Sequence, residues 1–423
     1  MNTFLHKLKL IVGDEQLRNR VLFIFGALII FRLLAVVPVP GVDAAMLAQF
    51  FSSNQFLGLL NLFSGGGLSH LSIVMLGVGP YITASIIMQL LTVMSPKMKS
   101  MYTEEGDAGR KKFMQYSRLL TLPLATLQAF SFLMLLESQG IVKHLGVTAF
   151  MGNLIVIVAG SMLLMWLGEL VTEFGIGNGV SIIIFSGIVA RIPQLAGQTL
   201  FSFDMSQVPV YLAFLAATVV IIAAVVLMTE AERPVPITYA KQVRGGQTYG
   251  GVSTYLPLRM NQAGVIPIIF ALSILLFPQM ILNILSYLKI AGVSEWSAKL
   301  LEFTNNQWLY AGVYFVLVFV FTYFYTAVTF DPDAMAKNLQ RSGAFIPGVR
   351  PGEHTAEYIG TLITRLTFMG AVFLGVVAVL PLIMKALTGI VALAVGGTAL
   401  LIVVSVVLDL IRRIDSQIAM REY

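Results

Sequence analysis

Apolar stretches long enough to cross a lipid bilayer recur along this chain and restrict its possible folds more than any other feature. The first runs from Val21 to Val37 and is interrupted by one charged residue, Arg32. A helix needs about 20 apolar residues to cross roughly 30 Å of hydrocarbon. By this measure the sequence predicts ten spans, at residues 20–38, 73–94, 116–136, 152–170, 180–198, 208–229, 264–287, 308–329, 365–385 and 390–411.

The composition also indicates an all-α polytopic membrane protein. The 423 residues are 57% hydrophobic and 11% charged, with a mean hydropathy of +0.85. Ordinary soluble domains contain about 25% charged residues, so a soluble enzyme is excluded. The chain has no cysteine and therefore no disulfide.

The distribution of lysine and arginine predicts the orientation of the loops. With a cytoplasmic N-terminus, ten spans place both termini in the cytoplasm. This puts 21 of the 27 basic residues on the inner side and five outside, with Arg32 within a span. Such a bias is what the positive-inside rule requires of a multi-span membrane protein in this orientation. The net charge of +6 is therefore mainly a consequence of topology.

Five spans precede the middle of the chain and five follow it. Because each half has an odd number of spans, the halves enter the membrane from opposite faces, as inverted repeats do. The inner loops at 95–115, 230–263 and 330–364 are long enough to meet cytoplasmic partners. The expected divisions are an amphipathic cytoplasmic segment at 1–19, a first half at 20–207, a second half at 208–411 and a cytoplasmic tail at 412–423.

A glycine-rich segment precedes the second span. Asn61 to Ser72 reads NLFSGGGLSHLS, which is too short and too polar to cross the membrane. Three consecutive glycines cost about 1 kcal/mol each in a helix, so an element built from them would be marginal and movable. Irregular backbone at membrane depth must be enclosed by protein or line a water-filled cavity. The segment is therefore either re-entrant or an extracellular loop.

The chain offers few groups for covalent or ion-coupled chemistry. It has no GxxxxGK[ST] phosphate loop, and its four histidines lack metal-ligand spacing. Acidic residues also avoid the centres of the spans, whereas ion-coupled carriers usually need cation-binding groups there. We therefore expect no enzyme, no metal and no cofactor. For a polytopic membrane protein without such groups, a small-solute secondary transporter and a noncatalytic assembly scaffold are two functions to weigh.

Two arginines stand out by position. Arg32 lies inside the first span, where it either snorkels, pairs with a backbone carbonyl or packs against another helix; a structural role is favoured. Arg350 lies in the loop Phe330–Tyr358, which begins with a predicted helix start at Asp331 and continues to a proline- and glycine-rich tip. An exposed arginine there suits docking to carboxylates or phosphates, although it also fits plain topological charge.

Six ordered segments carry a resemblance to a known family: VPVPGVDA at 37–44, LFSGGGLS at 62–69, GPYITASIIMQLL at 79–91, MWLGELVTEFGIGNGVSIIIF at 165–185, LPLRMNQAGVIPIIFA at 256–271 and SGAFIPGVRPGEHT at 342–355. Together they resemble the SecY family, the central subunit of the bacterial protein-conducting channel. The resemblance implies ten transmembrane helices in two inverted five-helix halves around a pore, closed by a re-entrant plug helix at 61–72. Plug residues would be Asn61, Phe63, Ser64, Gly65, Gly66, Gly67 and Leu68.

The resemblance also places a pore ring on aliphatic residues. These are Val78, Ile82, Val180, Ile184, Ile269 and Ile402. Two of the six are valine where the family often has isoleucine. Val78 with Ile82, and Val180 with Ile184, are spaced i and i+4 and so share a helix face. Taken alone, such pairs are ordinary packing; as a ring they would form a dry constriction that any extended chain can pass.

Further expectations concern the gate and the partners. The resemblance implies lateral-gate positions at Gln89, Asn261 and Gln262; for the last two, helix capping is the competing explanation. It implies SecE and SecG subunits, and a SecA motor or a ribosome docked through Arg350, with Lys241 and Arg244 second. The function implied is passage of unfolded polypeptides across the membrane, with lateral release of hydrophobic segments into lipid.

Overall fold

Helices make up most of the part of the chain that the structure describes. The computed structural model describes residues 13–40, 64, 66–68, 71–103, 105–138, 140, 146–190, 192–193, 197, 208–239, 242–244, 247–249, 253–287, 306–388 and 391–419. Each of the ten predicted spans overlaps one helix. Within these residues, five segments are long and apolar enough to cross a membrane alone: Glu15–Val36, Gly106–Glu137, Val147–Phe174, Trp308–Arg341 and Glu353–Met384.

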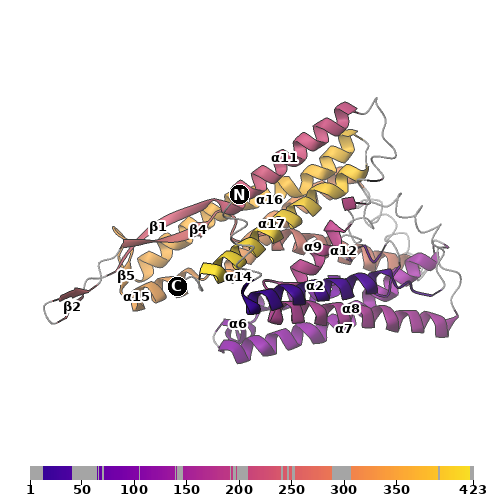
Figure 1. Ribbon diagram of the computed structural model, residues 1–423, viewed down its shortest axis with the longest axis horizontal. Coiled ribbons are helices and arrows are strands. Elements are labelled where there is room, and N and C mark those ends of the chain that lie inside the picture. Colours follow the sequence, from indigo (N-terminus) through magenta and orange to yellow (C-terminus); the bar gives the residue numbers. More distant parts are fainter. Residues whose placement is uncertain are drawn as a thin grey trace.

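The helices fall into two groups by their contacts, and the groups diverge in Figure 1. In the first group, α7 packs on α5 and α8, and α8 packs on α2 and α9. In the second group, α14 packs on α12 and α16, and α17 packs on α11 and α16. The bounds are α2 (Glu15–Val36), α5 (Gly79–Met94), α6 (Pro96–Thr103), α7 (Gly106–Ser138), α8 (Val147–Phe174) and α9 (Gly179–Val189), then α11 (Val208–Glu230), α12 (Ile266–Tyr287), α14 (Gln307–Thr329), α15 (Pro332–Arg341), α16 (Glu353–Thr388) and α17 (Val391–Ala419).

The two groups meet along a few helices. Helix α12 contacts α5 and α7, and α14 also contacts α5. On the other side, α17 contacts α9. The largest apolar cluster draws residues from both groups. The core of the molecule therefore lies where the groups join.

Local sequence explains several helix ends. Helix α2 begins at Glu15, earlier than predicted, because the Asp14 carboxylate accepts hydrogen bonds from the backbone N–H groups of Gln16 and Leu17 at 2.9 and 3.0 Å. The predicted start of α15 is confirmed, since Asp331 caps it in the same way. Helix α17 continues to Ala419, so much of the expected tail at 412–423 extends the last helix.

The second span starts later than predicted. Residues 71–78 form turns, and α5 begins at Gly79, with Pro80 in its first turn. Gly77 has a φ of +60°, which favours glycine and is incompatible with a right-handed helix. The Leu71 carbonyl accepts from the Val39 N–H at 2.8 Å, and the Val37 carbonyl accepts from the Ile73 N–H at 2.9 Å. A short β-bridge thus joins the turns to the end of α2.

A small sheet, which the sequence analysis missed, extends from one end of the long helices in Figure 1. Its strand order is β4 (Ser253–Arg259), β1 (Glu232–Tyr239), β5 (Ala344–Phe345), and all pairs are antiparallel. Its apolar core joins Val235 and Leu258 to Ile346, Ile359 and Ile363. The hairpin of β2 (Gln242–Arg244) and β3 (Gln247–Tyr249) lies farthest from the helices. The predicted loops 230–263 and 330–364 therefore build one folded unit.

Candidate functional site

The six aliphatic residues predicted for the pore ring lie in one apolar cluster. They come from two helices of each group: α5, with Val78 as its N-cap, and α9 in the first, and α12 and α17 in the second. The cluster contains Val78, Ile82, Ile184, Ile269 and Ile402 as buried members, with Val180 partly buried against them. The cluster is larger than these six, and it is where the helix groups meet.

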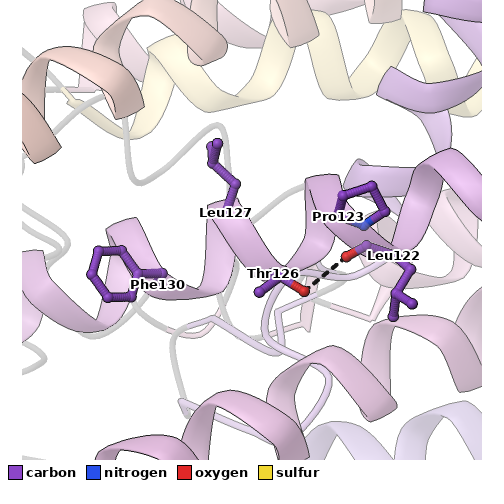
Figure 2. Close-up of a pocket in the computed structure, with 5 residues that line it drawn as sticks. All are labelled: Leu122, Pro123, Thr126, Leu127 and Phe130. Atoms are coloured by element: carbon purple, nitrogen blue, oxygen red, sulfur yellow. Dashed lines mark hydrogen bonds between the residues drawn. The ribbon is translucent and has the colours of Figure 1, made fainter.

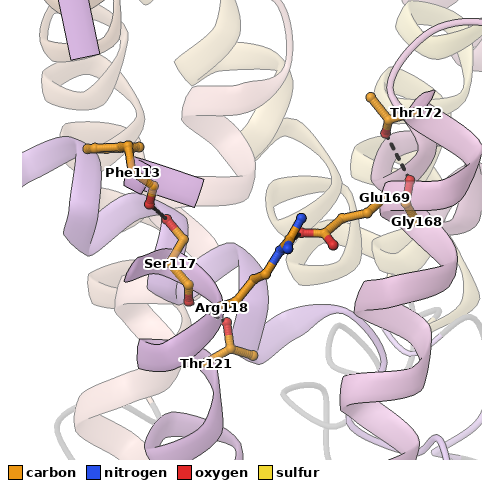
Figure 3. Close-up of polar contacts among 7 residues, drawn as sticks. All are labelled: Phe113, Ser117, Arg118, Thr121, Gly168, Glu169 and Thr172. Atoms are coloured by element: carbon orange, nitrogen blue, oxygen red, sulfur yellow. Dashed lines mark hydrogen bonds and ion pairs between the residues drawn. The ribbon is translucent and has the colours of Figure 1, made fainter. Parts of the chain in front are cut away.

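Glycine sets the position of α9, which carries Val180 and Ile184. A Cβ on Gly179 would lie 2.0 Å from the carbonyl oxygen of Gly168 in α8, so only glycine fits at this crossing. The Thr172 hydroxyl donates to the Gly168 carbonyl at 2.8 Å (Figure 3) and accepts from the Gly179 N–H at 2.9 Å. The start of α9 is therefore fixed against α8.

A close approach also fixes the turn that presents Val78. A Cβ on Gly160 in α8 would lie 2.1 Å from the carbonyl oxygen of Ile73. The next residue of α8, Ser161, is buried, and its hydroxyl donates to the Gly77 carbonyl at 3.0 Å. Helix α8 thus supports both first-group contributors to the cluster, α5 and α9.

The predicted plug lies only in part within the described residues. Asn61, Phe63 and Gly65 lie outside them. Ser64, Gly66, Gly67 and Leu68 are buried and form turns, so a plug helix is not seen at these four positions. Gly66 has a φ of +89°, which a right-handed helix does not accommodate.

The described part of the glycine-rich segment is enclosed by protein. Leu68, 2% exposed, packs in a cluster with Ala125 and Ala129 of α7 and Ile157 of α8. The Ser64 hydroxyl accepts a hydrogen bond from the Leu68 N–H at 3.0 Å. Irregular backbone at membrane depth requires such enclosure. This burial favours the re-entrant interpretation over an exposed loop.

The three residues predicted for the lateral gate share an unusual property. Among the described residues, the side-chain oxygens of Gln89 and Asn261 and both amide atoms of Gln262 are buried without a hydrogen-bond partner. Gln89 lies on α5, and the other two precede α12, which packs against α5. The Asn261 Nδ2 donates to the Gly264 carbonyl at 3.3 Å. A residue that caps the start of a helix instead accepts from backbone N–H groups, so this bond is not the one that the capping explanation predicts.

The predicted docking residues lie on the sheet end of the molecule. Arg350 is exposed in a tip shaped by Gly348 and Gly352, whose φ angles are +84° and +99°. The Thr355 hydroxyl donates to the Arg350 carbonyl at 2.8 Å and fixes the backbone there. Arg244 belongs to strand β2, and Lys241 lies outside the described residues.

Two interhelical ion pairs were not predicted, and each lies within one helix group. Arg118 on α7 donates to Glu169 on α8 at 2.7 Å (Figure 3). In the second group, Arg412 on α17 pairs with Glu230 at the end of α11 at 2.7 Å and donates to the Thr229 carbonyl at 2.8 Å. Residues so far apart in sequence carry no local signal of pairing. Because the Glu169 carboxylate is already paired with Arg118, Glu169 is a poor ligand for a transported cation.

A shallow apolar depression lies on α7 (Figure 2). Its five lining residues all come from that helix: Leu122, Pro123, Thr126, Leu127 and Phe130. The Thr126 hydroxyl donates to the Leu122 carbonyl at 2.9 Å and so is already engaged. Thr126 is the one polar side chain among the five, so the depression offers few groups that could orient a ligand. Within the described residues, no three histidine or acidic side chains gather in a metal-binding group.

These features define a polytopic helical membrane protein in which two groups of helices join at an aliphatic cluster. A protein-family model described as SecY matches residues 72–411. The chain is 41% identical to the protein translocase subunit SecY of Mycobacterium tuberculosis, with 96% of each chain covered. It is 40% identical to the subunit of the same name from Escherichia coli K12, with 97% of this chain and 94% of the relative covered. The chain therefore belongs to the SecY family.

Solved structures share the fold. One described as "The structure of a protein conducting channel" aligns with a TM-score of 0.66 at 19% identity and covers 94% of this chain and 91% of the other. Another, described as Sec61 in the canine ribosome-channel complex from the endoplasmic reticulum, aligns with a TM-score of 0.62 at 18% identity and the same coverage. At these identities the likeness concerns the fold alone.

Proposed function

We propose that this chain forms the pore of a channel that passes unfolded polypeptides across a bacterial cytoplasmic membrane. Its relatives are named as protein translocase subunits, and the fold is that of a protein-conducting channel. The observation that carries the proposal is the meeting of six predicted ring side chains from four helices in one apolar cluster. Aliphatic side chains offer no ligand to a hydrated ion, yet they yield to a peptide of any sequence.

The proposed topology has ten membrane-crossing helices in two inverted halves, 20–207 and 208–411, with both termini in the cytoplasm. The excess of basic residues on one side supports this orientation. The division of helix contacts into two groups, α2 to α9 and α11 to α17, supports the two halves. In this orientation, the sheet and α15 project into the cytoplasm.

The glycine-rich segment 61–72 is the proposed plug. Its described residues are buried, and Leu68 packs against α7 and α8. The described glycines form turns, so no regular helix has to unfold there on displacement. Such a segment seals the resting pore and leaves when a substrate enters.

The proposed lateral gate is the seam where α5 and α7 meet α12 and α14. Across this seam, α12 contacts α5 and α7, and α14 contacts α5, which joins the two helix groups. Buried amide atoms without a partner weaken it, namely the side-chain oxygens of Gln89 and Asn261 and both amide atoms of Gln262, since such atoms cost about 1–3 kcal/mol each. When the seam opens, a hydrophobic segment leaves the pore by partitioning into lipid.

Energy for transport must come from partners, which we propose to be the SecA motor or a translating ribosome, with SecE and SecG as companion subunits. Exposed Arg350 and the projecting β2–β3 hairpin supply the docking surface. A ribosome would be met through RNA phosphates, and that contact would weaken with salt.

Site-specific crosslinking tests the proposal. Because the chain lacks cysteine, one introduced thiol is unique. We expect Ile184→Cys and Ile402→Cys channels, reconstituted with SecE, SecG and SecA, to capture a precursor stalled during ATP-driven import. Ile363→Cys, buried in the core of the sheet, is the matched control and should remain silent. Efficient import without capture at either ring position would refute the pore assignment.

A further inference from the structure

Arg32 has a specific partner across the first helix group. It lies in the apolar part of α2, where a charged side chain persists only with compensation. One of its guanidinium nitrogens, Nη2, donates to the carbonyl oxygen of Ser186 in α9. The Phe31 ring lies beside the guanidinium, with its centroid 5.2 Å from Cζ. Of the alternatives raised by the sequence, the structure shows pairing with a backbone carbonyl.

The acceptor lies in the last turn of α9. This helix has 11 residues and ends at Val189. At 1.5 Å per residue it is about 16 Å long, roughly half the thickness of the hydrocarbon. A helix of that length that starts near one membrane face ends well inside the bilayer. The Ser186 carbonyl lies one residue before the carbonyls that lack intrahelical partners, and a cation near this end of α9 interacts favourably with the helix dipole.

The Ser186 carbonyl accepts two hydrogen bonds. The Ala190 N–H donates to it at 3.1 Å and closes the last turn, and Arg32 donates to the same oxygen. On α2, Ala27, Phe31 and Ala35 are buried in the same apolar cluster as residues of α9, and the two helices are in contact. The end of α9 is thus held by α2, and its start is held by α8.

We propose that Arg32 is a positioning residue for the constriction of the channel. Val180 and Ile184 lie between the two attachment points of α9, Gly179 on α8 and Ser186 on Arg32. With one attachment lost, α9 can tilt about the other, and its two ring side chains move out of register with those of α5, α12 and α17. This inference rests on the proposed function, because it assigns Arg32 to the seal of the same pore.

The test uses the reconstituted channel complex in lipid nanodiscs and planar bilayers. Arg32→Met removes the donor and keeps the length of the side chain, and Arg20→Met on the exposed part of the same helix is the matched control. We expect amide hydrogen exchange at residues 186–190 to rise about tenfold in Arg32→Met, the factor typical of a lost hydrogen bond to a charged group. Resting ion conductance should rise with it. Arg32→Lys should give an intermediate result in both measurements.

A benchmark separates this inference from the proposed function. Ile184→Gly tests the ring directly. If Ile184→Gly leaks while Arg32→Met changes neither exchange nor conductance, the role of Arg32 is refuted and the channel stands. Faster exchange without leak in Arg32→Met would also refute it, because α9 would move without affecting the seal. Should Arg32→Met not insert, Arg32→Lys and Arg32→Gln decide, with exchange expected to increase from Arg to Lys to Gln.

Discussion

Arg118 and Glu169 join α7 to α8 through an ion pair of 2.7 Å, with the carboxylate side chain mostly shielded and 17% exposed. Arg412 and Glu230 join α17 to α11 over the same distance. Each pair joins two helices of one group, and neither crosses the junction between the groups. The junction is held instead by the apolar cluster that both groups share.

The Arg118–Glu169 pair should show coupling in a double-mutant cycle. Arg118→Met and Glu169→Gln should each lower the stability of the folded channel, and the double variant should lose less than their sum. The coupling expected for a partly exposed pair is up to about 1 kcal/mol. Thermal unfolding in detergent at low and high salt measures it. Arg110→Met, exposed on the same helix, serves as the control, and simple additivity would show that the pair contributes nothing.

Gly179→Ala should displace α9. Its added Cβ would clash with the Gly168 carbonyl, at 2.0 Å, and overpacking of this kind costs about 1–3 kcal/mol. We expect a lower unfolding temperature together with a raised resting conductance. Gly152→Ala on α8, where a Cβ meets nothing within 4 Å, should leave both unchanged. Equal behaviour of the two variants would contradict the proposed close packing.

Ile184→Gly and Ile82→Gly should raise the resting ion leak. Both side chains are buried in the cluster at the junction, and their removal leaves space that water can enter. Single-channel recording in planar bilayers measures the leak. Ile155→Gly, on the exposed face of α8, tests for a general effect of glycine in a helix. Deletion of residues 61–69 should act in the same direction as the ring variants, and unchanged conductance in all of them would remove these site assignments.

Gln262→Leu should stabilise the closed seam. The substitution removes two buried amide atoms that lack partners among the described residues, each worth about 1–3 kcal/mol. The variant should unfold at a higher temperature and import precursors with weak signal sequences more slowly. Gln340→Leu, exposed on α15, controls for added hydrophobicity. Faster import by Gln262→Leu would indicate that the amide holds the gate closed.

Arg350→Glu should weaken motor-driven transport while the channel itself still inserts. The side chain is exposed on a tip whose backbone is fixed by Thr355, so reversing its charge changes docking and not folding. ATP-driven import of a precursor into vesicles measures this, at several salt concentrations. Lys337→Glu, exposed on α15, is the matched charge reversal. Normal import by the Arg350 variant would remove this residue from the docking surface.

Sequence predicted the helices well because a span is encoded locally, by the length and apolarity of one stretch. Boundaries were less predictable: apolar residues 73–78 read as the start of a span, whereas the positive φ of Gly77 delays α5 to Gly79. The sheet was missed because β1 and β5 are more than a hundred residues apart, and three prolines interrupt β1 and β4.

The site was predictable to a different degree. The six aliphatic ring positions were identified through the resemblance to a family. Their i, i+4 spacing alone could not distinguish a pore ring from ordinary helix packing. The partner of Arg32 is 154 residues away and is a backbone atom, so no side-chain pattern could reveal it. Likewise, the unpaired state of Gln262 depends on what surrounds it in three dimensions.

The β-bridge between Pro38 and Ser72 has a mechanical consequence for the glycine-rich segment. Two backbone bonds clamp the far end of that segment to the end of α2, on either side of this bridge. If this segment is the proposed plug, the clamped end serves as its pivot, and the segment leaves and returns while it stays tethered to α2. Reclosure after each substrate would then require no search.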